Sequence, residues 1–202
     1  MKTLVIDNLG LEVEGYVINS GFSVKSKQRV AEIQAELNDK FGDSVWSFPQ
    51  TSLHITLMDW FAPLVSYDEG SNKLFNKYRN EYEKVLENIL SDQSPIKIHF
   101  DTIKVSPSAV YIQGTDDGSY EMIRKKFLQK IQLVEGTKKS PQIIHSSIAR
   151  FNEEINLHAV QDFVVSLDMD LYETISEFRL VKETKVPMLE FEVIRTFKLS
   201  KN

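Results

Sequence analysis

Two short segments of the chain alternate apolar and polar positions in the same way. Residues 53–58 read LHITLM and residues 144–149 read IHSSIA, so a hydroxyl-bearing residue follows each histidine by two positions. In a β-strand, residues i and i+2 project from the same face, so each imidazole lies beside a hydroxyl group. The apolar residues between them face the other way, where packed helices would cover them. The pattern predicts two half-buried strands, each presenting one histidine and one hydroxyl.

Elsewhere, apolar residues recur at spacings of three and four, which is typical of amphipathic helices. Segments with this spacing are residues 30–41, 74–89, 120–134 and 157–167. Ser26 is the expected N-cap of the first helix, and Gly42 and Gly136 are the expected stops of the first and third. The second helix must end before Pro95, because the residue preceding a proline disfavours the helical conformation.

The remaining apolar segments predict strands, which are bounded by Gly, Pro and Ser turn signals. They are residues 15–19, 51–60, 96–101, 109–113, 142–151, 178–181 and 190–194. Their order contains a repeat, because a strand, a helix and a histidine strand follow one another twice. The spacing from Ile18 to His54 is 36 residues, and from Ile112 to His145 it is 33. Repeated units of similar length usually pack as related halves, so we expect two lobes whose histidine strands meet across a cleft.

Composition limits what those lobes can do. The chain has 202 residues, of which 42% are hydrophobic and 26% charged, which fits a single bilobal domain over residues 1–202. It has no Cys, which excludes disulfides, thiolate catalysis and thiolate metal sites. No apolar run approaches the roughly 20 residues of a membrane span, so we expect a cytoplasmic protein without a membrane partner. The net charge of −5 argues against a duplex DNA partner.

A histidine followed two places later by Ser or Thr is a weak pattern by itself, and a single buried His is usually a satisfied core residue. The shared context favours function here, because both copies have apolar flanks of matching parity and similar preceding units. His99 and His158 lack this context, one beside a Phe in a strand and the other at a polar helix start. We therefore expect these two to be structural or exposed.

Two imidazoles and two hydroxyls facing one cleft suit the chemistry of a phosphodiester. Cleaving such a bond needs a base on the attacking oxygen and an acid on the leaving one, and His serves both roles near neutral pH. Hydroxyl groups of Thr56 and Ser147 can stabilise the non-bridging oxygens. The residue types leave open which of His54 and His145 is the base.

At these residues the chain resembles the 2H phosphoesterase superfamily, which includes 2′-5′ RNA ligases and cyclic nucleotide phosphodiesterases and is named for two His-x-Thr/Ser motifs on facing strands. The resemblance covers most of the chain and extends to residues 178–184 and 197–199 near its end. It implies an α+β, bilobal, pseudo-symmetric fold, with two mainly antiparallel sheets flanked by helices around a central cleft. It also implies that His54 and His145 act as acid and base without a metal or other cofactor, while Thr56 and Ser147 hold the phosphate.

The chain departs from the family pattern at two places. Ser147 stands where Thr is commoner, which is a mild chemical change. Residues 58–60, Met-Asp-Trp, replace a continuation that usually contains Phe and Gly. The second difference falls at the pocket wall and bears on substrate identity.

Strand parity adds two aromatic candidates to the site. Trp60 has the same parity as His54, so it either stacks on a base or closes the core. Phe151 shares parity with His145 in the same way.

Three further residues are candidates for the substrate site. Arg150 is one by the resemblance, although its parity is opposite to that of His145, so it reaches a phosphate only if the strand bends or ends there. Tyr16 and Asn19, on the first strand, are candidates for the cleft lining.

These observations predict a metal-independent phosphodiesterase that acts as a monomer on nucleotides, short RNA or oligonucleotides. The expected bonds are 2′,3′-cyclic phosphates, 2′-5′ linkages or cyclic oligonucleotides. A second hypothesis is a module that binds a nucleotide or RNA end without turnover. A third makes His54 and His145 metal ligands, although no further ligand stands at a recognisable spacing.

Overall fold

The structure is a computed structural model that describes residues 1–137 and 142–199. The helices are α1 (Val24–Phe41), α2 (Ser71–Leu90), α3 (Ser119–Lys130) and α4 (Leu157–Val165), and a 3-10 turn, η1 (Gly42–Ser44), follows α1. The strands are β1 (Glu12–Gly21), β2 (Val45–Ser47), β3 (His54–Phe61), β4 (Ile96–Ser106), β5 (Ala109–Thr115), β6 (Ile144–Phe151), β7 (Leu171–Ile175), β8 (Glu177–Lys185) and β9 (Glu190–Lys198). Within the described ranges, no helix is both long and apolar enough to span a membrane.

The strands form two antiparallel sheets, one for each histidine strand. The first sheet has the order β3-β1-β8-β9 and the second has the order β2-β6-β5-β4-β7. Every pairing within the two sheets is antiparallel. His54 begins the edge strand β3, and His145 lies in β6, inside the second sheet. The α+β architecture expected from the sequence is confirmed.

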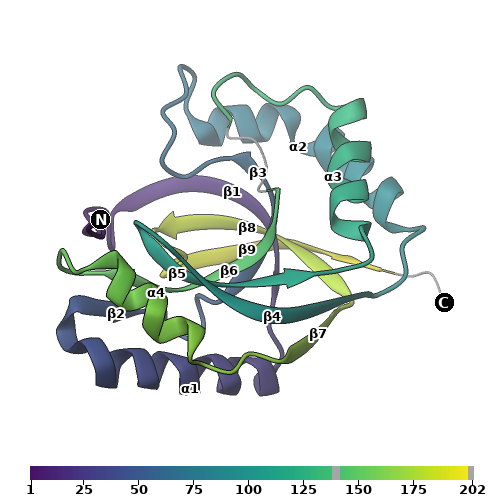
Figure 1. The fold of residues 1–202 in the computed structure, drawn as a ribbon. Coiled ribbons are helices and arrows are strands. Elements are labelled where there is room, and N and C mark those ends of the chain that lie inside the picture. Colours follow the sequence, from purple (N-terminus) through teal and green to yellow (C-terminus); the bar gives the residue numbers. More distant parts are fainter. Residues whose placement is uncertain (138–141, 200–202) are drawn as a thin grey trace.

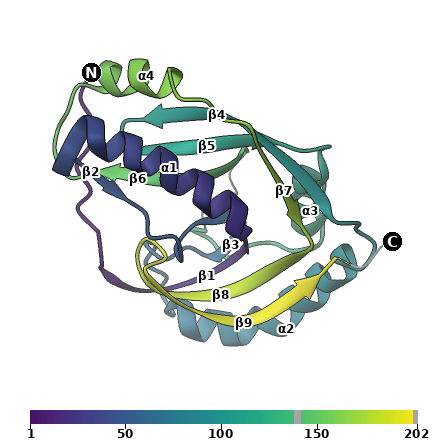
Figure 2. The same cartoon turned by 90° about the horizontal axis from the view of Figure 1, so that it is seen from below.

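Each repeat sends its helix to the sheet of the other repeat. Helix α1 follows β1 of the first sheet, yet it contacts β2, β6 and β7 and crosses the second sheet (Figure 2). Helix α3 follows β5 of the second sheet and contacts β3, beside α2, which contacts β1, β3 and β9. The pairs α1/α4 and α2/α3 therefore lie on opposite sides of the molecule (Figure 1). This exchange joins the two lobes through a continuous apolar core.

Helix boundaries differ from the expectation at two ends. The N-cap of α1 is Ser23, whose hydroxyl accepts a hydrogen bond from the Ser26 amide at 3.3 Å, so Ser26 lies inside the helix. Ser23 is fixed there because its amide and hydroxyl both donate to the buried Glu173 carboxylate. Helix α3 ends at Lys130 rather than at Gly136, because Ile131 is extended (φ −122°, ψ 126°) and buries its side chain in that conformation.

Candidate active site

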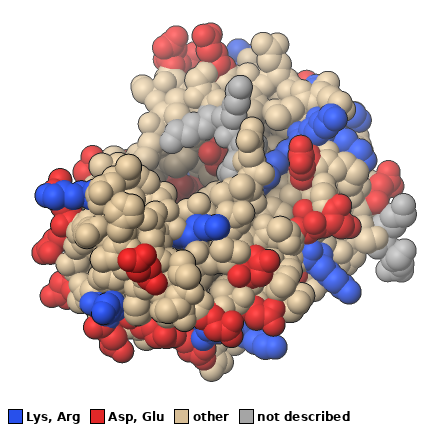
Figure 3. Space-filling view, viewed as in Figure 1, with Lys and Arg blue, Asp and Glu red and all other residues tan. Residues whose placement is uncertain are grey.

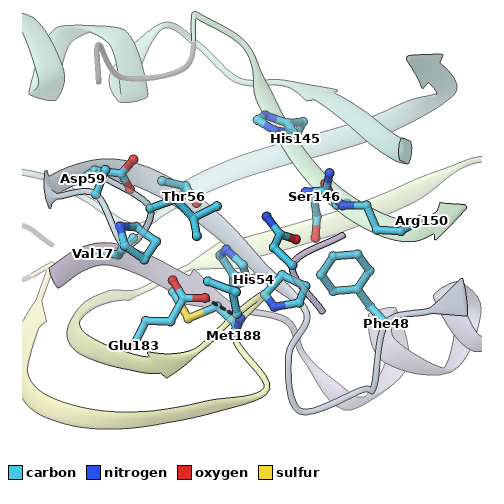
Figure 4. A pocket seen from close by; sticks show the side chains of 17 residues that line it. Val17, Phe48, His54, Thr56, Asp59, His145, Ser146, Arg150, Glu183 and Met188 are labelled. Atoms are coloured by element: carbon cyan, nitrogen blue, oxygen red, sulfur yellow. Dashed lines mark hydrogen bonds between the residues drawn. The ribbon is translucent and has the colours of Figure 1, made fainter. Parts of the chain in front are cut away.

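A cavity of about 240 Å³ lies between the two sheets and is lined by the histidines of both strands. His54 and Thr56 face it from β3, and His145 and Ser147 face it from β6. Figure 4 shows the two imidazoles on separate elements that approach the same space. The hollow is visible from outside in Figure 3, with acidic side chains inside it. The structure thus brings together the four residues that the two motifs single out.

Both imidazoles are oriented by the backbone two residues earlier in the chain. His54 Nδ1 donates to the carbonyl oxygen of Ser52 at 2.7 Å. His145 has the equivalent hydrogen bond with the backbone of Ile143. A bond from Nδ1–H to a carbonyl fixes the neutral tautomer with Nε2 as the acceptor. In His54 the nitrogen that can accept a proton is therefore Nε2, because Nδ1 is bonded to the backbone of its own strand.

Bulges interrupt both histidine strands three residues after the histidine. In β3, Thr56 pairs with Asn19 and Met58 with Ile18, so Leu57 has no partner across the sheet. In β6 the same irregularity leaves Ile148 unpaired. An extra residue in one strand reverses the side-chain alternation beyond it.

The two bulges turn one further residue of each strand into the cavity. Asp59 follows the bulge of β3 and Arg150 follows the bulge of β6, and each lies five positions after its histidine. Both line the cavity, on opposite sides in Figure 4. The two walls are equivalent in backbone geometry and opposite in charge.

Buried polar side chains on the exchanged helices hold the bulges in place. Arg124, on α3, donates to the carbonyls of Leu57 at 2.6 Å and of Thr56 at 3.0 Å. Gln34, on α1, donates to the carbonyl of Ile148 at 2.8 Å. Both donors are nearly inaccessible to solvent, and an unpaired carbonyl at either place would be costly. The helix of one repeat therefore fixes the backbone of the histidine strand of the other repeat.

Arg150 presents its guanidinium to the cavity with part of its hydrogen-bonding capacity unused. Its Nη1 has a long contact of 3.4 Å with the carbonyl of Ser108. Its buried Nε has no hydrogen-bond partner among the described residues. Burial lowers the pKa of the guanidinium, although an arginine remains charged. A half-buried cation of this kind is suited to an anionic ligand.

The other wall of the cavity carries two carboxylates. Glu183, on β8, is 4% exposed, and its Oε1 accepts a hydrogen bond from the Met188 amide at 2.6 Å (Figure 4). Burial raises the pKa of Glu183 to about 7, the Met188 amide opposes the rise, and the Asp59 carboxylate adds to it. Glu183 therefore retains its proton to a higher pH than an ordinary carboxyl group does.

Both histidines are held mainly neutral. Burial lowers the pKa of His54 to about 4, and the positive charges of Arg179 and His145 act in the same direction. Burial also lowers the pKa of His145, aided by Arg124 and Arg150, while the Ile143 backbone opposes the shift. Both imidazoles line the same cavity, and a charge on His145 disfavours a charge on His54.

The aromatic residues proposed from strand parity lie outside the cavity. Trp60 is 0% exposed and packs against Tyr82 and Phe127, with centroids 5.3 and 6.1 Å away. The bulge at Leu57 reverses the alternation, so that Asp59 faces the cavity and Trp60 faces the core. Phe151 is also 0% exposed, because the bulge at Ile148 turns it to the core.

The two candidates from the first strand also lie outside the cavity. Tyr16 stacks on Phe75 with the centroids 3.8 Å apart and donates to Asn72 Oδ1, on the covered side of the first sheet. Asn19 lies opposite Thr56 but is buried, and its Oδ1 accepts from Arg179 Nη2 at 3.0 Å.

Sequence reasoning placed residues 58–60 at the pocket wall but did not single out Asp59 or Glu183, both of which line the cavity. A charged residue inside the apolar segment 57–61 was an available signal for Asp59, although its parity hid it. The remaining histidines are remote from the cavity lining: His158 is exposed at the start of α4, and His99 binds Asp170 at 2.7 Å. In residues 1–137 and 142–199, no cluster of three His, Cys, Asp or Glu side chains is arranged to hold a metal ion.

The two-sheet fold and the paired His-x-Thr/Ser strands define the class of two-histidine phosphoesterases. The family model of the 2′-5′ RNA ligase superfamily matches residues 22–186, and the chain belongs to this superfamily. No curated protein matches the chain.

Solved structures with the same fold are similar over nearly the whole chain. The protein TT0787 of Thermus thermophilus superposes with a TM-score of 0.67 at 14% identity, over 93% of this chain and 100% of that one. E. coli LigT in its apo form superposes with a TM-score of 0.58 at 13% identity, over 94% and 99% of the two chains. A LigT structure complexed with 3′-AMP gives a TM-score of 0.57 at 12% identity, over 94% and 99%. These similarities confirm the bilobal fold expected from the sequence.

The buried Glu183 makes stability depend on pH in a way that a single substitution tests. The pKa of Glu183 in the folded protein is about 7, above the ordinary value of 4.5. Its contribution to the free energy of unfolding is therefore complete below pH 4.5 and is lost as the pH rises through 7. Glu183→Gln keeps the acceptor for the Met188 amide and removes the charge. The free energy of unfolding of Glu183→Gln minus that of the wild type should therefore increase by about 2 to 3 kcal/mol between pH 4 and pH 8.

Urea unfolding of both proteins at several pH values measures this difference. Glu192→Gln, at an exposed position of β9, is the matched control and should follow the wild type. A Glu183→Gln difference that is constant with pH would contradict the raised pKa.

Proposed function

We propose that the chain is a metal-independent phosphodiesterase that cleaves RNA-type phosphodiesters by two-histidine acid–base catalysis. The observation that carries the proposal is the pairing of His54 and His145 across one cavity, each oriented by the backbone two residues before it. Hydroxyls of Thr56 and Ser147 and the guanidinium of Arg150 line the same space. The proposed unit is the single bilobal domain 1–202, acting as a monomer in the cytoplasm.

The reaction assigned to this geometry is a displacement at phosphorus. For a 2′,3′-cyclic phosphate, one imidazole takes a proton from water as the water oxygen bonds to phosphorus. The bond from phosphorus to one ribose oxygen breaks, and the other imidazole, as imidazolium, gives that oxygen a proton. The product is a phosphomonoester with a free neighbouring hydroxyl. Thr56, Ser147 and Arg150 stabilise the charge on the non-bridging oxygens.

Substrate binding supplies the protonated histidine that the reaction needs. In the free protein both imidazole pKa values are lowered, by burial first and then by neighbouring cations. A phosphodiester anion in the cavity compensates those cations and favours an imidazolium beside it. The bound state therefore holds one neutral and one protonated histidine more readily than the empty site does.

Nucleotides are the proposed ligand class, with 2′,3′-cyclic phosphates, 2′-5′ linkages and cyclic oligonucleotides as the proposed bonds. The superfamily name refers to 2′-5′ RNA, and structures of the similar protein LigT contain 3′-AMP and ATP. The Arg150 wall provides the positive charge that a phosphate requires, within a protein of net charge −5.

A substrate screen in excess EDTA tests the proposal. The panel contains 2′,3′-cyclic mononucleotides, 2′-5′ and 3′-5′ oligoadenylates, cyclic oligonucleotides and ADP-ribose cyclic phosphate. Turnover of at least one with EDTA present supports the proposed function. Tight binding of a panel member without turnover would instead favour a binding module, and turnover that requires added zinc or manganese would favour metal ligation by the histidines.

A further inference from the structure

The second sheet has one covered face and one open face. The covered face carries apolar residues that pack towards α1 and α4, and most of them are 0 to 7% exposed. These include Ile98, Phe100, Ile103, Val110, Ile112 and Ile148. On the open face, polar and aromatic side chains of β4, β5 and β7 are half-buried or exposed. These side chains form a polar surface beside the cavity.

The register of the strands makes this open face continuous with the candidate active site. Ser147 lies opposite Tyr111, which in turn lies opposite Lys104. His145 lies opposite Gln113 in the next row. Paired residues project to the same face, so these rows run directly from the two β6 residues of the cavity onto the open sheet.

Aromatic rings stand at both ends of this surface. The Tyr111 ring packs edge-on against His145, with the centroids 5.6 Å apart. At the far edge, Tyr172 of β7 is 68% exposed and stacks on His99, with centroids 4.2 Å apart and planes 2° apart. His99 is held by Asp170, so the stacked pair is an ordered flat platform open to solvent.

Two lysines lie on this open face. Lys97 and Lys104 project from β4 on the same face as Tyr111 and Tyr172, and both are exposed. Two exposed carboxylates lie nearby: Asp101 accepts a hydrogen bond from Thr102 at 2.8 Å, and Asp170 binds His99 at 2.7 Å. Lysines interleaved with aromatic rings on an open sheet are the groups that bind a phosphate backbone and its bases.

We infer that the open face of the second sheet is a binding track for single-stranded RNA, which holds the nucleotides adjoining the phosphodiester in the cavity. The inference rests on the proposed function and makes an oligonucleotide, rather than a mononucleotide, the preferred substrate. Three inter-strand spacings separate β6 from β7, which is about 14 Å. Stacked bases repeat at about 3.4 Å, so this track spans a few nucleotides.

Two substrates with the same reactive group distinguish the contribution of the track from that of the cavity. We would measure kcat/KM for a 2′,3′-cyclic mononucleotide and for an RNA octamer that ends in a 2′,3′-cyclic phosphate. The variants are Tyr172→Ala and Lys104→Glu, neither of which touches the cavity lining. Tyr172→Phe keeps the ring and controls for the first. Lys198→Glu, exposed on β9 of the other sheet, makes the same charge change and controls for the second.

The wild type should prefer the octamer. Each of the two test variants should lower kcat/KM for the octamer about tenfold, which is within the range for loss of one stacked base, and leave the mononucleotide unchanged. Both control variants should retain the preference. Equal use of the two substrates by the wild type, or equal loss on both in the variants, would overturn the inference.

A binding measurement keeps the inference separable from the proposed chemistry. Fluorescence anisotropy with an octamer ending in a 3′-phosphate reports the dissociation constant without turnover. Tyr172→Ala and Lys104→Glu should weaken this binding about tenfold, and the dependence on salt should be shallower in Lys104→Glu. Weakened binding without any turnover would reject only the proposed function. Binding unaffected by either variant would reject the RNA track.

Discussion

Alanine at His54 or His145 is expected to lower kcat by about 10²- to 10⁴-fold, because each imidazole supplies one of the two proton transfers. The double variant should lose little more than the slower single variant, since residues that act as a unit are not additive. The measurement is kcat on the best substrate of the screen, with circular dichroism to verify the fold. Removing a half-buried imidazole leaves the Ser52 or Ile143 carbonyl without that hydrogen bond, so thermal stability is measured in parallel.

The histidine that lies outside both the cavity and the proposed RNA track provides the control for this experiment. His158 is exposed on α4, and His158→Ala should keep the wild-type rate. Full activity in His145→Ala would remove the basis for the two-histidine mechanism.

Arg150→Met should lower kcat/KM by about 10²-fold, the second largest effect we expect. Methionine fills much of the same volume but removes the only guanidinium that lines the cavity in the described structure. The loss should appear in kcat as well as KM, because charge on the non-bridging oxygens grows towards the transition state. Steady-state kinetics on the best substrate of the screen separate the two parameters.

Lysine at the same position distinguishes charge from geometry. Arg150→Lys keeps the positive charge and loses the planar fork, so its rate should lie between those of the wild type and the methionine variant. A methionine variant within threefold of the wild type would show that Arg150 does not act on the phosphate.

The periodic parts of the sequence were sufficient to predict most of the fold. The histidine strands, the four helices and the closing pair β8 and β9 are confirmed. The three-residue strand β2 and the five-residue strand β7 were missed, because so short a segment carries little periodicity. The helix exchange was also missed, since it depends on which sheet each helix covers rather than on its own residues.

The cavity lining was predicted only up to the bulges. Parity counting assumes unbroken alternation, so it placed Trp60 and Phe151 at the site and left Asp59 and Arg150 on the wrong face. Each bulge is stabilised by a hydrogen-bond donor on a helix that is distant in the sequence, and the local residue pattern does not reveal such a donor. Arg150 was retained as a candidate only through the family resemblance.

The internal repeat extends to the helix residues that donate hydrogen bonds to the bulges. In α1, Gln34 follows Ile33 and precedes Leu37 by three residues, and in α3, Arg124 has the same relation to Ile123 and Phe127. Both donate to the carbonyl of the bulged residue on the opposite histidine strand. The backbone symmetry is thus preserved while the residues that face the cavity have diverged in charge.

The dependence of kcat/KM and kcat on pH, measured from pH 4 to 10 with and without EDTA, tests the central claim most directly. If one histidine acts neutral and the other protonated, kcat/KM is bell-shaped, with limbs that belong to the coupled pair. Because both pKa values are lowered from 6.5 in the free protein, its maximum should lie below pH 6.5. The limbs of kcat should lie at higher pH, because the bound phosphate favours imidazolium. A flat profile, or activity that vanishes in EDTA and returns with zinc or manganese, would contradict paired acid–base catalysis by His54 and His145.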